Sequence, residues 1–245
     1  MPASGRPADD DAYDERLRLD LLLLRAGPAR IGRQSLSQQA AEAIKARIFS
    51  LDLPPGSRLV IDDLASTLGV SRTPVREGLR ELISEGLVTY DGNTYAVTTF
   101  TRPQIEDLFA IRRVLEALAA SQAAQRMSPG AVEELRALVQ QGANRIAAGD
   151  TEFLISSDMR FHGDIAAGAN NPRLRQLLGS LREQSWMIRR WGFLKRLAEP
   201  VETATVEEHL AILERLAGHD GAGAAALMEE HLRKGERRTL EWLGL

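Results

Sequence analysis

The chain has 245 residues, of which 44% are hydrophobic and 27% charged, and it contains no cysteine. This composition excludes a disordered or low-complexity protein, and the lack of thiols excludes disulfide scaffolds, cysteine-ligated zinc and thiol catalysis. The formal net charge is −3, so binding to nucleic acid would have to use a local patch. Apolar runs such as Leu21 to Leu24 are too short to cross a bilayer, which predicts a cytoplasmic protein with no membrane partner.

Residues 1–34 are expected to form an N-terminal arm that is partly disordered, because Met1 to Asp14 is rich in Pro, Gly, Ala and Asp. Within this arm, Leu17 to Arg25 is predicted as a short helix. It is expected to pack against the body of the protein or a second subunit, rather than to anchor the chain to a membrane surface.

Residues 35–100 have the pattern of three helices followed by a hairpin. The second helix is expected to be capped by Asp62 and ended by Gly69, while the third is expected to be capped by Ser71 and ended by Gly86. Two β-rich runs on either side of Asp91-Gly92-Asn93 predict the hairpin.

The rest of the chain is predicted to be an antiparallel bundle of six to seven helices, because helical patterns alternate with short Gly-, Pro- or Asn-containing breaks. The predicted helices cover residues 103–126, 129–148, 151–168, 172–192, 203–217 and 222–243. The fold class is therefore predicted to be mainly α.

The third helix has the composition of a DNA-recognition helix. Arg72, Thr73 and Arg76 lie near its start, where side chains of such helices reach base edges in the major groove, and Ser71 precedes them. Gly92 at the hairpin tip would allow the backbone to approach a sugar-phosphate chain. However, residues 35–100 carry six Lys/Arg and eight Asp/Glu, so a small α/β module without DNA-binding function is the alternative.

The residues of this segment resemble the winged helix-turn-helix of the GntR family. The resemblance rests on LPPGSRL and on SRTPVRE followed by L-x-x-L and EGLV, and it covers residues 35–100. It implies that Ser71, Arg72, Thr73, Arg76 and Gly92 contact operator DNA. Two positions depart from the family: Gly78 replaces the usual Ala, and Asp62 stands where some relatives carry a basic residue.

The bundle contains a set of residues that suits a divalent metal. Asp158 and His162 are four residues apart, on one helix face, while His209 and His231 belong to two other predicted helices. One carboxylate and three imidazoles can bind Zn²⁺, Ni²⁺ or Mn²⁺. By themselves, however, such histidines are more often surface or core residues with ordinary polar partners.

The same residues resemble the FCD ligand-binding domain of FadR-like GntR regulators. The resemblance extends over about residues 103–242, within a domain predicted to cover 103–245, and rests on Asp107 to Glu116, Asp158-x-x-x-His162, Asn171-Pro172-x-Leu174 and the segments around His209 and His231. It implies that the Asp and three His bind a divalent metal, most simply Zn, which holds a small carboxylate effector. It also implies that Arg112 lines the effector pocket; the alternative is a surface salt bridge with Glu116. Arg160 and Arg189 are further candidates.

The sequence thus predicts a metabolite-responsive transcriptional regulator, in which a DNA-binding domain precedes an effector-binding and dimerisation domain. It is expected to be a homodimer that binds double-stranded operator DNA and represses transcription. It is not expected to be an enzyme. Two other functions remain as alternatives: a metal-dependent hydrolase, and an architectural DNA-binding protein that takes no effector.

Overall fold

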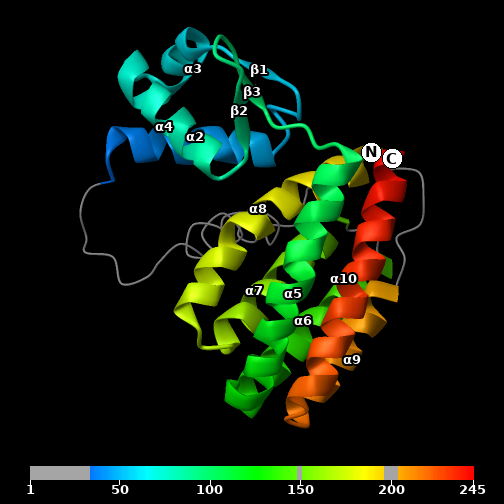
Figure 1. Ribbon diagram of the computed structural model, residues 1–245. Helices are drawn as coiled ribbons and strands as arrows, with labels where there is room; N and C mark the ends of the chain where they lie inside the picture. Colours follow the sequence, from blue (N-terminus) through cyan, green and yellow to red (C-terminus); the bar gives the residue numbers. More distant parts are fainter. Residues whose placement is uncertain (1–33, 148–150, 196–203) are drawn as a thin grey trace, which may run out of the picture. The chain divides into compact units, whose positions relative to one another are not determined.

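A computed structural model describes residues 34–147, 151–195 and 204–245 (Figure 1). The arm over residues 1–33, with its predicted helix, lies outside the described residues. Helix α2 (Leu36–Phe49) begins with a capping box, in which the Gln38 backbone N–H donates to the Ser35 hydroxyl and the Ser35 N–H donates to the Gln38 side chain. No helix in the described ranges is long and apolar enough to cross a membrane.

Helices α3 (Ile61–Leu68) and α4 (Arg72–Ser84) form the predicted helix-turn-helix, with Gly69 at a φ of 66° between them. The prediction that Asp62 caps α3 is wrong: the N-cap is Val60, and Asp62 lies in the first turn, where its charge suits the helix dipole. Ser71 occupies the N-cap position of α4 as predicted, but its side chain makes no capping hydrogen bond.

A three-stranded antiparallel sheet in the order β1-β3-β2 forms the wing; β1 precedes α3, and β2 and β3 follow α4. Strands β2 (Val88–Tyr90) and β3 (Tyr95–Val97) are the predicted hairpin, with Val88 opposite Val97 and Tyr90 opposite Tyr95. The short strand β1 (Arg58–Leu59), which pairs with β3, was not predicted because two residues are too few to show an alternating pattern.

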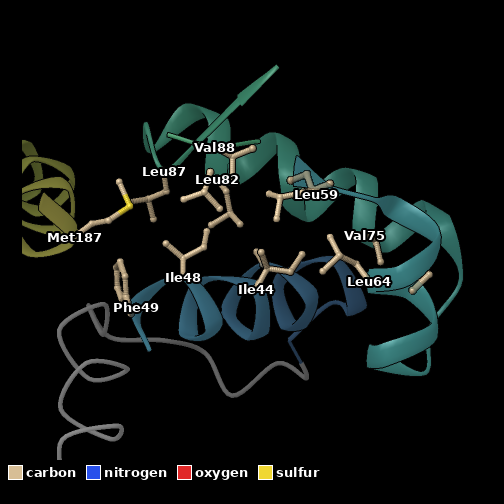
Figure 2. Packing of buried hydrophobic residues seen from close by; sticks show 14 of the residues in the cluster. Ile44, Ile48, Phe49, Leu59, Leu64, Val75, Leu82, Leu87, Val88 and Met187 are labelled. Carbon is tan, nitrogen blue, oxygen red and sulfur yellow. The ribbon is translucent and has the colours of Figure 1, made fainter. Parts of the chain in front are cut away.

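Apolar side chains from α2, α3, α4 and the wing meet in one cluster (Figure 2). Ile44 and Ile48 of α2 are fully buried against Leu79 and Leu82 of α4. The two helices approach closely at Gly78, where an added Cβ atom would lie 2.9 Å from the Ala41 backbone nitrogen and 3.0 Å from the Ser37 carbonyl oxygen. The departure at Gly78 therefore has a packing reason, because backbone atoms occupy the space that a side chain needs.

We expect Gly78→Ala to lower the free energy of unfolding by about 1–2 kcal/mol, because the cost of overpacking exceeds the gain in helix propensity. Gly179→Ala is the matched control, since a Cβ atom at this helical glycine of α8 meets nothing within 4 Å. That control should stabilise the protein slightly. Urea unfolding measures both effects, and stabilisation by Gly78→Ala would contradict the close approach of α2 and α4.

Helices α5 to α10 form the C-terminal bundle, with α5 and α10 packed along each other (Figure 1). Their bounds are Arg102–Arg126, Pro129–Ala147, Thr151–Gly168, Pro172–Lys195, Ala204–Ala217 and Gly221–Leu243. The predicted bounds agree closely, because Pro, Gly and Asn residues mark most of the breaks. Phe109, Phe153 and Phe161 are among the largest fully buried side chains of the core.

Helix α8 also contacts α2 and the turn that follows α4. The Trp186 ring packs 4.5 Å from the Phe49 ring, and Met187 joins the same apolar cluster as Leu87 (Figure 2). Beside them, buried Lys45 forms ion pairs with Glu85 at 2.5 Å and with Glu183 of α8 at 3.1 Å. The apolar cluster of the winged helix thus includes residues of the bundle.

Candidate functional site

The start of α4 presents the predicted DNA-contacting side chains to solvent. Arg72, Thr73 and Arg76 are exposed, whereas Val75 and Leu79 are buried. Arg80 is exposed as well and continues the spacing of four residues set by Arg72 and Arg76, a signal that sequence reasoning missed. One face of α4 therefore carries arginines while the opposite face packs into the core.

Arg72 is held by the first turn of α3. Its Nε lies 2.6 Å from Asp62 Oδ1, and its Nη2 donates a 2.9 Å hydrogen bond to Oδ2. The two side chains are 70% and 57% exposed, so this pair contributes at most about 1 kcal/mol. Asp62 can therefore orient Arg72 without preventing it from turning to another acceptor.

The hairpin tip is built by Asp91, whose carboxylate accepts hydrogen bonds from the Asn93 and Thr94 backbone N–H groups at 2.9 and 2.7 Å. These bonds lower the pKa of Asp91. Gly92 has a φ of 99° and open space around it, so the tip presents bare backbone as predicted. The exposed Tyr90 donates its hydroxyl proton to the Gly92 carbonyl at 2.6 Å.

The four predicted metal ligands converge in the bundle. Asp158 and His162 come from α7, His209 from α9 and His231 from α10, and one ligand atom of each lies within 4.8 Å of the others. All four are buried. Because they belong to three helices, the bundle must be folded before they meet.

The three imidazoles turn the same nitrogen toward a common point. His231 Nε2 lies 3.2 Å from His162 Nε2 and 3.4 Å from His209 Nε2. Burial lowers the pKa of His231 to about 4 and that of His209 well below its usual value, which keeps these imidazoles neutral. Asp158 Oδ1 is buried and has no hydrogen-bond partner among the described residues. The arrangement brings three imidazole nitrogens and a carboxylate oxygen together, as a cation site requires.

Two carboxylates that the sequence reasoning did not select support the ring orientation. Glu116 Oε2 lies 2.6 Å from His162 Nδ1, and Glu208 Oε2 lies 2.7 Å from His231 Nδ1. Burial alone would raise the pKa of Glu116, but Arg112 and His162 lower it to about 2. Carboxylates hydrogen-bonded to the outer nitrogen fix the tautomer of metal-binding histidines, which is the arrangement of Glu208 at His231; Glu116 lies close to His162 Nδ1 without hydrogen-bond geometry.

A hollow of about 290 Å³, measured out to bulk solvent, opens beside these ligands. Its lining includes Arg112, Asp158, Met159, His162, Arg182, Ser185, Trp186 and Arg189. It adjoins the ligand cluster directly, since Asp158 and His162 belong to both.

The three arginines considered as effector-binding candidates lie in different surroundings. Arg112 lines the hollow and also pairs with Glu116 at 2.7 Å, but this pair is buried and not the surface salt bridge considered as the alternative. Arg189 lines the hollow and forms an ion pair with Asp158. The remaining candidate, Arg160, is exposed, pairs with Asp164 four residues along α7 at 3.3 Å, and does not line the hollow.

Comparison with known families matches both halves of the chain. The FCD domain pattern matches residues 107–234, and the pattern of the bacterial regulatory proteins of the gntR family matches residues 36–93. The chain belongs to the GntR family. It is a transcriptional regulator with an FCD domain, and the regulators that it resembles are not enzymes.

Individual members of the GntR family resemble this regulator over most of its length. The HTH-type transcriptional regulator McbR of Escherichia coli (strain K12) is 28% identical over 85% of this chain and 94% of its own. The Nta operon transcriptional regulator of Aminobacter aminovorans is 30% identical over 76% and 86%. The solved structure of E. coli McbR/YncC superposes with a TM-score of 0.72 at 25% identity, covering 85% of this chain and 98% of that one.

Proposed function

We propose that this regulator is a metal-containing repressor whose operator binding responds to a small carboxylic acid. The observation that carries the proposal is the convergence of four buried ligand groups next to a hollow lined by arginines. Residues 35–100 would bind the operator and residues 103–245 would bind the effector and a second subunit. As a regulator of operator DNA, it would act in the cytoplasm.

The donor set fits a divalent ion. A carboxylate oxygen and three imidazole nitrogens are ligands that Zn²⁺, Ni²⁺ and Mn²⁺ accept, and Zn²⁺ is the simplest choice. Asp158 Oδ1 has no hydrogen-bond partner, so an ion would satisfy a buried polar atom that is otherwise costly. With four protein ligands, an ion that accepts five or six ligands keeps a position for an effector oxygen.

The hollow suits a small anion. Three arginines line it, and an arginine recognises a carboxylate through paired N–H donors. A bound acid would therefore contact the ion at one end and guanidinium groups around it.

The proposed function can be tested with operator fragments selected in vitro from random DNA. Metal-free protein, zinc-loaded protein and zinc-loaded protein with each member of a panel of small acids are compared in gel-shift titrations at fixed salt. We expect one acid to weaken operator binding only when zinc is present. Consumption of the acid would indicate a hydrolase instead, and indifference to every acid would indicate an architectural protein.

A second copy of the chain is the partner that we infer for α5. Ile111, Val114 and Leu118 follow one another at helical spacing, and they are 51%, 70% and 45% exposed. Single exposed apolar residues are common, but a stripe of three on one helix face is typical of an interface. Two DNA-binding heads are also needed, because one recognition helix buries too little surface for specific binding.

We expect Val114→Arg to weaken dimerisation about tenfold or more, because a two-fold interface would place an unpaired charge at both equivalent positions. Sedimentation at micromolar concentration measures the change. Leu245→Arg is the control, since Leu245 is 45% exposed at the end of the chain and outside the stripe. A dimer that tolerates Val114→Arg as well as it tolerates the control would place the interface elsewhere.

A further inference from the structure

Arg182 of α8 is a buried arginine for which the described residues provide no ion-pair partner. Its side chain lines the hollow, the residue is only 8% exposed, and its Nε is buried without a hydrogen-bond partner. Burial lowers the pKa of Arg182, while the charges of Glu116 and Glu183 raise it. An arginine remains protonated even so, which means that a residue lining the hollow carries a desolvated N–H donor.

The carboxylates around Arg182 are already engaged by other groups. Glu116 contacts both Arg112 and His162, and Asp158 pairs with Arg189. Glu183, next to Arg182 in the chain, pairs with Lys45. A metal ion at the four ligands would add further positive charge to the same hollow, so the surroundings of Arg182 favour an anion from outside the chain.

We propose that Arg182 binds a second acidic group of the effector, which makes the effector a dicarboxylate; this rests on the proposed function. One carboxylate occupies the end of the hollow at Asp158 and the metal ligands, and the other pairs with the Arg182 guanidinium. A monocarboxylic acid carries no charge at its far end. It would therefore leave Arg182 buried and without a bound anion.

The position of Arg182 along α8 fits this division. Arg182, Ser185, Trp186 and Arg189 all line the hollow, at helical positions that share one face. Arg189 marks the metal-ligand end through its ion pair with Asp158. Arg182 precedes it by two turns, about 10 Å along the helix axis, so the two anion sites are separated rather than superimposed.

The test uses the full chain loaded with zinc and compares acids that differ by one carboxylate. Butyrate and succinate share a four-carbon backbone, and malonate and glutarate vary the separation of the two acid groups. Affinities are measured by calorimetry at pH 7 and fixed salt, with zinc content determined after each titration to detect removal of the ion. We expect at least one dicarboxylate to bind about tenfold or more tightly than butyrate, since hydrogen bonds to charged groups are the stronger ones.

Arg182→Gln should weaken dicarboxylate binding about tenfold more than butyrate binding while leaving the affinity for zinc within about twofold, and Arg182→Lys should restore part of the difference. Arg175→Gln is the matched control, because Arg175 is exposed on the same helix and lies outside the hollow. Equal binding of mono- and dicarboxylates by the unaltered protein overturns the inference, as does an equal loss of both in Arg182→Gln or no loss of either. If the inference about Arg182 fails but the protein still binds zinc and butyrate, the proposed function stands. If the protein does not bind zinc, the proposed function and the inference about Arg182 both fail.

Discussion

Adding zinc to the metal-free protein is expected to raise its melting temperature by about 5–10 °C. At a free ion concentration of about 100 times the dissociation constant, binding to the folded state alone contributes about 2.7 kcal/mol. For a chain of this size, each kcal/mol raises the melting temperature by about 2–4 °C. The ligands come from α7, α9 and α10, so unfolding separates them and only the folded chain gains.

His209→Ala should abolish most of this gain and lower the zinc content found by elemental analysis. His219→Ala is the control: His219 is exposed, its Nδ1 lies 2.8 Å from the Ala124 carbonyl, and it is not among the four ligands. The control should melt with the same zinc-dependent increase as the unaltered protein. If chelator-treated and zinc-loaded proteins melt together, or if both variants respond alike, these histidines serve only to pack the bundle.

Arg72→Ala is expected to weaken operator binding about 5- to 150-fold and to relax the preference at one base position. A bidentate arginine contact to guanine contributes about 1–3 kcal/mol of discrimination, whereas the exposed pair with Asp62 contributes at most about 1 kcal/mol. Because the contact to the base contributes more free energy than the ion pair with Asp62, Arg72 is expected to leave Asp62 and contact the base when DNA binds. Gel-shift titration against the selected operator and its single-base variants measures both effects.

Arg233→Ala is the control for this loss. Arg233 is 55% exposed and pairs with Glu229 and Glu230 on α10, so it resembles Arg72 in exposure and pairing but lies in the bundle. It should leave operator affinity unchanged. Unaltered affinity of Arg72→Ala, or an equal loss on operator and random DNA, would show that Arg72 does not read a base.

Local sequence signals were sufficient for most of the helix boundaries, because Pro129, Pro172 and Gly69 act on their own backbone neighbours. The four metal ligands were grouped by the family resemblance and not by local signals, because residues of three different helices meet only through the tertiary fold. The error at Asp62 arose because Asp is a good N-cap residue by type, whereas the backbone turns into α3 two residues earlier.

Residues whose roles depend on tertiary contacts could not be recognised in the same way. Glu116 lies 42 residues or more before the metal ligands, and nothing in its local pattern shows that it contacts His162. Arg182 belongs to an arginine-rich helix whose members differ only in which face is buried. Helix propensity is a local quantity and favours Ala over Gly at position 78. The close approach of α2, which requires Gly78, is a tertiary contact and does not show in the local sequence.

The apolar cluster that contains Trp186 and Met187 has a consequence for dividing this protein into pieces. These side chains are 6% and 0% exposed because α2 and the turn after α4 cover them. A bundle expressed without the winged helix would expose Trp186 and Met187 to water and would remove the ion pair between Glu183 and Lys45. The isolated winged helix would lose part of its own core. Residues 34–245 form one compact unit, and studies of effector binding on a truncated chain would therefore describe an altered surface.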